Sequence, residues 1–212
     1  MSTLRINRMI SGITALGPGR RFGLWVQGCE LACPGCASVD TWASDGGELV
    51  DVTLLAQQLL AAARRDELTG ITLTGGEPID QAAGLAELLD IVAGHPLGAD
   101  LDVLVFTGYP RIVAERRGSE LLTRADTMVA GPYRATQPST HPLIASANQE
   151  LVHLTARSEA RHRVTTASPT IQVLTHDGEL VLVGLPEPGD LHRLRAGLSA
   201  QGITMEEVSW VK

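Results

Sequence analysis

Apolar side chains recur every three or four residues in two segments of the chain, a spacing typical of a helix with one buried face. In Asp51–Arg65 this pattern predicts an amphipathic helix with Asp51 as its N-cap. The segment Leu85–Val92 repeats the pattern, and Gly94 is expected to end the second helix. A shorter helix is expected at Ile112–Arg117.

Short runs of β-branched and aliphatic residues alternate with these helices and predict strands. The expected strands are Leu4–Ile10, Phe22–Gln27, Ile71–Thr74, Asp102–Phe106 and Thr127–Ala130. Because strands and helices alternate at this spacing, we expect βαβ crossovers and a parallel sheet.

The last third of the chain has a different pattern. A strand is expected at Leu151–Thr155, and the pair Ile171–Thr175 and Glu179–Gly184 predicts a hairpin with its turn at residues 176–178. A helix with three inward leucines is expected at Asp190–Ala200. The segment Arg157–Pro169 is polar, and we expect it to be a loop.

Length and composition narrow the class of protein. A chain of 212 residues is expected to form one domain with a modest appendage. With 44% hydrophobic and 19% charged residues it is an ordinary globular chain, and a net charge of −7 argues against nucleic acid as the main partner. The aliphatic runs are too short to span a membrane, and the N-terminus lacks an apolar signal region, so we expect a cytoplasmic protein.

All three cysteines, Cys29, Cys33 and Cys36, lie within eight residues in a C-x3-C-x2-C array. An odd number of cysteines in a reducing compartment excludes a disulfide framework and favours a metal or redox site. A structural zinc site needs a fourth protein ligand, and the nearest histidine, His95, is far along the chain. A 4Fe-4S cluster on three cysteines leaves one iron free for a ligand. Zinc and a chance grouping of structural cysteines remain the alternatives.

The cysteine spacing resembles that of the radical S-adenosylmethionine superfamily. The glycine-rich stretch from Gly17 to Cys29 and the segment Thr74–Pro78, which is similar to the superfamily's GGE motif, resemble it too. The resemblance implies that Gly75, Gly76 and Glu77 hold the methionine amino end of S-adenosylmethionine. The glycines also have a physical reason, because a backbone that approaches a ligand closely has no room for a side chain.

Within the superfamily the chain resembles the activating enzymes of anaerobic ribonucleotide reductase and, more distantly, of pyruvate formate-lyase. The matching segments are Pro34-Gly35, Phe106–Tyr109, Asp126–Tyr133 and Ser146–Gln149. With the cysteine array the resemblance extends from Leu4 to about Leu154, so it assigns nothing to the tail from Arg157.

The resemblance also implies a reaction. A reduced 4Fe-4S cluster, one per chain, donates an electron to S-adenosylmethionine, and the resulting 5′-deoxyadenosyl radical abstracts hydrogen from a target. The implied target is a glycyl radical enzyme, and the implied electron donor is flavodoxin or ferredoxin. The alternatives are a radical enzyme that acts on a small molecule or ribosomal peptide, and a non-catalytic zinc or iron-sulfur module.

The three cysteines are the expected cluster ligands and catalytic residues. The residues expected to bind S-adenosylmethionine are Gly35, Ala37, Gly75, Gly76, Glu77, Thr107 and Tyr109. Arg20 and Arg21 are candidates to neutralise the cofactor carboxylate or contact an acidic partner, with solvated loop charges as the alternative. His141 and His153 are candidate proton relays, although a lone histidine is more often structural.

The expected fold is α/β, a partial (β/α)6-like parallel barrel with a small C-terminal hairpin-plus-helix appendage. Its site is expected at the carboxyl ends of the strands, where ligands bind in such sheets. We expect a radical S-adenosylmethionine core at residues 1–156 and the appendage at residues 157–212.

Overall fold

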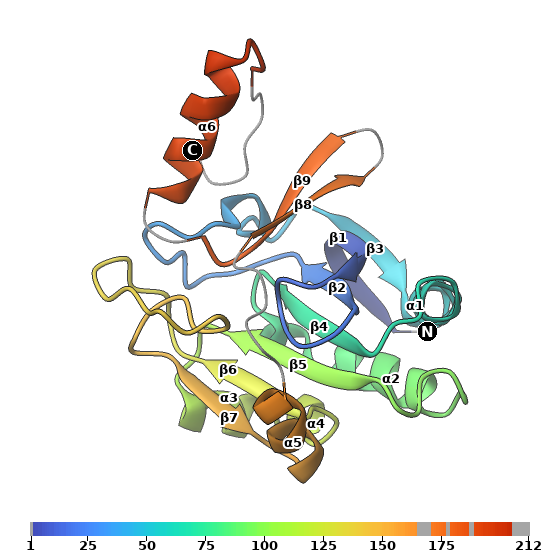
Figure 1. Cartoon of the computed structure of the whole chain (residues 1–212). Coiled ribbons are helices and arrows are strands. Elements are labelled where there is room, and N and C mark those ends of the chain that lie inside the picture. The colour runs from blue at the N-terminus through green and yellow to red at the C-terminus, as the bar shows by residue number, and fades with distance from the viewer. Residues whose placement is uncertain (1, 165–170, 177–178, 187–188, 205–212) are drawn as a thin grey trace.

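Seven strands form one open sheet, and a separate two-stranded hairpin packs on it (Figure 1). The computed structural model describes residues 2–164, 171–176, 179–186 and 189–204. Along the sheet the strand order is β3-β1-β2-β4-β5-β6-β7. The strands are β1 (Thr3–Ile13), β2 (Arg21–Val26), β3 (Glu48–Asp51), β4 (Gly70–Gly75), β5 (Asp102–Thr107), β6 (Thr127–Ala130) and β7 (Glu150–His153), with β8 (Ile171–His176) and β9 (Glu179–Gly184) in the hairpin.

Helices lie in all three connections between the parallel strands, and two further helices follow β7 and β9. The helices are α1 (Val52–Arg65), α2 (Ala82–Ala93), α3 (Arg111–Arg117), α4 (Ser119–Leu122), α5 (Ala156–Val164) and α6 (Asp190–Ala200), with short 3-10 turns η1 (Val39–Thr41) and η2 (Pro78–Gln81). The predicted helices and strands up to residue 153 are confirmed to within a few residues, and Asp51 caps α1 by accepting from the amides of Thr53 and Leu54. No described helix is both long and apolar enough to cross a membrane.

The parallel part of the sheet is smaller than expected. Strands β2, β4, β5 and β6 are parallel, whereas β1, β3 and β7 pair antiparallel at the two sides. The sheet is therefore a mixed, mostly parallel α/β sheet that does not close, rather than six parallel strands of a barrel. The connection from β1 to β2 (residues 14–20) is too short for a crossover, and residues 131–149 between β6 and β7 contain no helix, so both connections return antiparallel.

The two faces of the sheet have different coverings. On one face Leu24, Leu73 and Val105 belong to the main apolar core, which also contains the buried sides of α1 and α2. The next residue along two of these strands, Trp25 or Phe106, points to the opposite face. That opposite face, without α1 and α2, is where a ligand has room to approach.

The segment expected as a loop at Arg157–Pro169 is a helix, α5, over its described part. Residues 165–170 lie outside the described residues. Two side-chain contacts hold α5 to the sheet: Arg157 pairs with Asp126 (2.7 Å), and buried Ser158 hydrogen-bonds to Thr127 and to His153 Nδ1 (2.8 Å). The prediction was wrong because these tertiary contacts stabilise a helix that has almost no apolar face of its own.

The β8–β9 hairpin packs on the face of the sheet that the main core leaves open. Val183 is buried in a second apolar cluster with Ile10, Ile13, Leu16 and Trp25. The side-chain oxygen Oε1 of Gln172 also accepts a hydrogen bond from the backbone N–H of Thr14 (2.7 Å). The predicted hairpin is confirmed, although its turn at 177–178 lies outside the described residues. In α6, Leu191, Leu194 and Leu198 are only half-buried, so these leucines are less deeply buried than the sequence pattern predicted.

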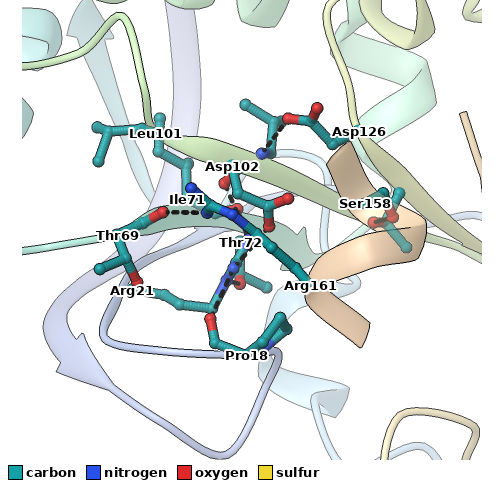
Figure 2. Close-up of polar contacts among 12 residues, drawn as sticks. Pro18, Arg21, Thr69, Ile71, Thr72, Leu101, Asp102, Asp126, Ser158 and Arg161 are labelled. Carbon is teal, nitrogen blue, oxygen red and sulfur yellow. Dashed lines mark hydrogen bonds and ion pairs between the residues drawn. The ribbon is translucent and has the colours of Figure 1, made fainter. Parts of the chain in front are cut away.

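A buried ion pair ties the amino ends of the parallel strands together (Figure 2). Arg21, at the start of β2, and Asp102, at the start of β5, are both fully buried, so neither sequence-based role for Arg21 fits its position. All five guanidinium N–H groups find acceptors. The acceptors are Thr72 Oγ1 (2.7 Å), Asp102 Oδ2 (2.8 Å) and the carbonyls of Pro18 (3.0 Å), Ile71 (2.7 Å) and Asp102 (2.9 Å).

Replacing Arg21 with Met is expected to lower the free energy of unfolding by about 3–5 kcal/mol, because it leaves the Asp102 carboxylate buried without its partner. The matched control is Arg20→Met, a change of the same type at an exposed neighbour, with an expected loss below about 0.5 kcal/mol. Urea unfolding of both variants measures the difference. Similar small losses in the two proteins would show that the sheet does not depend on this ion pair.

Candidate active site

A cavity of about 350 Å³ lies at the carboxyl ends of β2, β4, β5 and β6. The segment that carries Cys29, Cys33 and Cys36, which we call the cysteine loop, follows β2. The Gly75-Gly76 turn ends β4, Thr107 ends β5 and Gly131 follows β6. All of these segments line the cavity. The predicted site residues that it brings together are Cys29, Cys33, Gly35, Cys36, Ala37, Gly75, Gly76, Glu77 and Thr107. This is the end of the sheet at which the sequence placed the site.

The cysteine loop is held in shape by its own backbone. The amides of Gly28 and Cys29 donate to the carbonyls of Thr41 (2.8 Å) and Trp42 (3.1 Å), which closes the loop at its base. Buried Gln27 supports it from below, with its Nε2 donating to the carbonyl of Ala43 (2.6 Å). These hydrogen bonds fix the base of the loop relative to β2 and η1.

The three thiols are free and half-buried on the cavity side of this loop. Burial raises the pKa of the Cys29 and Cys36 thiols above the ordinary value and so disfavours their thiolate forms. Among the described residues, no three His, Cys, Asp or Glu side chains converge on one metal position. A cubane cluster does not require such convergence, because each cysteine binds a different iron, and the donor set of three thiols fits one.

The Gly75-Gly76 turn packs directly against the start of the cysteine loop. The amides of Gly76 and Glu77 donate to the carbonyls of Val26 (2.8 Å) and Gly28 (2.8 Å). A Cβ on Gly76 would lie 2.3 Å from the Gly28 carbonyl oxygen, and Gly75 has a φ of +100° that favours glycine. Glycine is therefore required here because the turn approaches the chain's own backbone closely, whether or not a ligand also binds there.

Glu77 joins β4 to β5 from beneath the turn. Its side chain is 1% exposed and accepts from Thr107 Oγ1 (2.8 Å) and from the amides of Gly108 (2.8 Å) and Ile79 (2.9 Å). Burial raises its pKa to about 7, although these three hydrogen bonds favour the charged form. Glu77 thus fixes the end of β5 relative to the turn.

Other sequence candidates lie away from the cavity. The hydroxyl of Tyr109 donates to Asp80 (3.0 Å) and accepts from Arg117 (2.7 Å), so its side chain contacts η2 and α3 and does not line the cavity. His141 and His153 do not line it either. Arg20 is exposed, and its Nε donates to the carbonyl of Asp66 (3.0 Å).

Several cavity residues were not predicted. Six of the chain's seven aromatic residues lie in the described part, and four of those six line the cavity: Trp25, Trp42, Phe106 and Tyr133. Arg8 lines it as well, with its guanidinium 5.1 Å from the centre of the Trp25 ring and paired with Asp40. Pattern alone offered a signal only for Trp25 and Phe106, each of which lies near the end of a predicted strand.

Comparisons with known proteins define the class. A family model described as a 4Fe-4S single cluster domain matches residues 15–152, well over half of the chain. The chain therefore belongs to the 4Fe-4S single cluster domain family. Residues after 152 lie outside the match.

Its relatives make the class more specific. The anaerobic ribonucleoside-triphosphate reductase-activating protein of Enterobacteria phage T4 is 30% identical over 138 residues, 64% of this chain and 85% of that protein. The pyruvate formate-lyase-activating enzyme of Streptococcus mutans is 26% identical over 148 residues, 66% of this chain and 54% of that enzyme. The resemblance to radical S-adenosylmethionine activating enzymes is thus confirmed. The solved structure of QueE from Escherichia coli is 19% identical, with a TM-score of 0.38, and the match covers 50% of this chain and 53% of that one.

The raised pKa of Glu77 predicts a pH dependence of stability. Because the folded-state pKa of about 7 exceeds the ordinary value of 4.5, the stability from the protonated form is fully present below pH 4.5. It is lost as the pH rises to 7. Between these values the free energy of unfolding of the metal-free wild type should fall relative to Glu77→Gln by on the order of 1 kcal/mol per pH unit. Urea unfolding at several pH values tests this, and a constant difference between the two proteins would contradict it.

Proposed function

We propose that this chain is a radical S-adenosylmethionine enzyme that activates a glycyl radical enzyme. One observation carries the proposal: the three thiols, the Gly75-Gly76 turn and the end of β5 line one cavity. When bound, a 4Fe-4S cluster and S-adenosylmethionine supply a 5′-deoxyadenosyl radical that abstracts a hydrogen atom. The named activity of the relatives supports a protein as the target.

The proposed ligands of the cluster are Cys29, Cys33 and Cys36. The chain has no fourth cysteine, so a cluster held by these three thiols would keep one iron open to a further ligand such as S-adenosylmethionine. The loop is closed at its base by backbone hydrogen bonds, which holds the thiols near their positions before the cluster arrives. This preorganisation lowers the entropy cost of binding the cluster.

The proposed cofactor surface is the turn after β4 with its neighbours on the cysteine loop and β5. Gly75 and Gly76 offer backbone without side chains, Gly35 and Ala37 present small groups, and Thr107 lines the same cavity at the end of β5. Glu77 acts as a positioning residue, because its carboxylate is already bound to Thr107 and Gly108. The aromatic residues Trp25, Trp42, Phe106 and Tyr133 exclude water from the cavity.

A flavodoxin or ferredoxin is the proposed electron donor. Cys29 also lines a second, more open hollow of about 630 Å³, bounded by Asp80 of η2 and by Arg117 of α3. The cysteine loop therefore has an accessible side apart from the cavity, and a small protein approaching there does not compete with the substrate. We further propose that the reaction takes place in the cytoplasm and that residues 1–156 form the core.

A second candidate function is a radical enzyme that acts on a small molecule or a ribosomal peptide. The observation in its favour is that residues after 152, outside the family match, line the same cavity. Such a cavity is of the size that holds one small ligand.

Cluster binding is tested by replacing one cysteine. Anaerobically reconstituted wild type should hold about 4 iron and 4 sulfide per chain and release 5′-deoxyadenosine from S-adenosylmethionine on reduction. Cys33→Ala should lose both, because each thiolate binds its own iron. Asp45→Asn, an exposed change just beyond the same loop that lines neither the cavity nor the second hollow, is the control and should keep both. A colourless wild type that holds one zinc instead would contradict the proposal.

The target is tested by electron paramagnetic resonance. Reduced protein with S-adenosylmethionine and the anaerobic ribonucleotide reductase of the same organism should give a glycine-centred radical on the reductase. No such signal should appear without that partner, because only the partner presents the reacting glycine. Accumulation of 5′-deoxyadenosine with a metabolite or peptide fraction, and no glycyl radical with the reductase, would favour the second candidate.

A further inference from the structure

The C-terminal hairpin supplies one side of the candidate active site. Ile171 of β8, Leu182 of β9 and Leu191 of α6 line the cavity together with the cysteines, and we call these three residues the C-terminal wall. In Figure 1 the hairpin and the start of α6 lie next to the cysteine loop, which is drawn in light blue. None of the three is within residues 15–152, the part that matches the family.

The hairpin does not need the C-terminal wall in order to pack on the sheet. Its other face does this, with Val183 buried and with Leu174 and Val181 packed against the same apolar cluster, although Val183 lines the cavity as well. By contrast, the three wall residues are half-buried and belong to none of the apolar clusters of the described residues. Their apolar surface is therefore available to whatever occupies the cavity.

The strand register places two of these side chains together. Leu182 pairs with Val173, and Ile171 pairs with Gly184, so Ile171 and Leu182 are diagonal neighbours on one face of the hairpin. Gly184 also lines the cavity and adds no side chain beside Ile171. Together with Leu191, Ile171 and Leu182 form the apolar lining that the C-terminal wall contributes to the cavity.

We propose that the C-terminal wall is a specificity-determining surface that binds an apolar side chain next to the hydrogen donor of the substrate. The proposal rests on the proposed function for the reaction, in which a reductant supplies one electron and methionine leaves. The Cα–H bond of glycine then breaks as the C–H bond of 5′-deoxyadenosine forms. An apolar group gains by leaving water against this wall, whereas a hydroxyl there has no described polar wall residue to bind.

Two peptides of equal size and charge test the wall. They are Ser-Ala-Val-Gly-Val-Ala-Ser and Ser-Ala-Thr-Gly-Thr-Ala-Ser, fluorescein-labelled and with both α-hydrogens of glycine replaced by deuterium. Fluorescence anisotropy with the reconstituted, S-adenosylmethionine-loaded protein measures binding, and mass spectrometry measures deuterium in 5′-deoxyadenosine after reduction. Wild type should bind the valine peptide about 10-fold more tightly, since valine and threonine differ only by a methyl and a hydroxyl.

Three variants locate the effect. Leu182→Asn should reduce the preference for the valine peptide to below about 3-fold, whereas the conservative variant Leu182→Met should keep it. Leu180→Asn is the matched control, because Leu180 lies on the same strand and face, is 61% exposed and does not line the cavity, so the preference should persist.

The outcomes separate the wall from the reaction. The proposal for the C-terminal wall would be overturned if wild type bound the two peptides equally or bound neither. It would also be overturned if Leu180→Asn lost the valine preference as much as Leu182→Asn does. A valine preference that depends on Leu182, with no deuterium in 5′-deoxyadenosine, would support the wall and contradict glycine as the hydrogen donor of the proposed function.

Discussion

The fully bonded guanidinium of Arg21 fixes three parallel strands relative to one another. It contacts β4 through Thr72 and Ile71 and β5 through Asp102, all without access to water. Since a buried charge is costly unless every hydrogen bond is made, small shifts of these strands are unfavourable. Space for this group is reserved at Gly70, where a Cβ would lie 2.4 Å from Arg21 Nη1. Strand alignment at the amino ends therefore depends on one side chain.

At the carboxyl ends of the strands a second buried ionisable side chain, Glu77, fixes neighbouring segments relative to one another. Glu77 holds the turn after β4 to the end of β5, while the backbone of the same turn bonds to the start of the cysteine loop after β2. The parallel register pairs Val26 with Gly75, so the two loops begin at the same level of the sheet. The cavity lies where these loops meet, and all three cysteines line it.

Local pattern predicted most of the helices and strands up to residue 153 and the Asp51 cap, but it missed the strand β3 and the short helix α4. The cavity lies at the end of the sheet where the sequence placed the site. Local pattern failed where long-range contacts decide. Adjacent arginines look like loop charges, and nothing near Arg21 reveals Asp102, 81 residues away. The polar α5 is stabilised by its contacts with Asp126 and Thr127, and the hairpin is anchored through Gln172 to Thr14, 158 residues earlier. The role of the tail was therefore invisible in sequence.

The central claim is that the cysteine loop and the C-terminal hairpin enclose one ligand site. Hydrogen exchange of anaerobically reconstituted protein, with and without S-adenosylmethionine, tests it most directly, because each segment reports separately. The account predicts slower exchange on cofactor binding in residues 29–42 and in residues 182–186, with residues 52–65 of α1 unchanged as the internal reference. Protection confined to other segments, or absent from both of these, would contradict it.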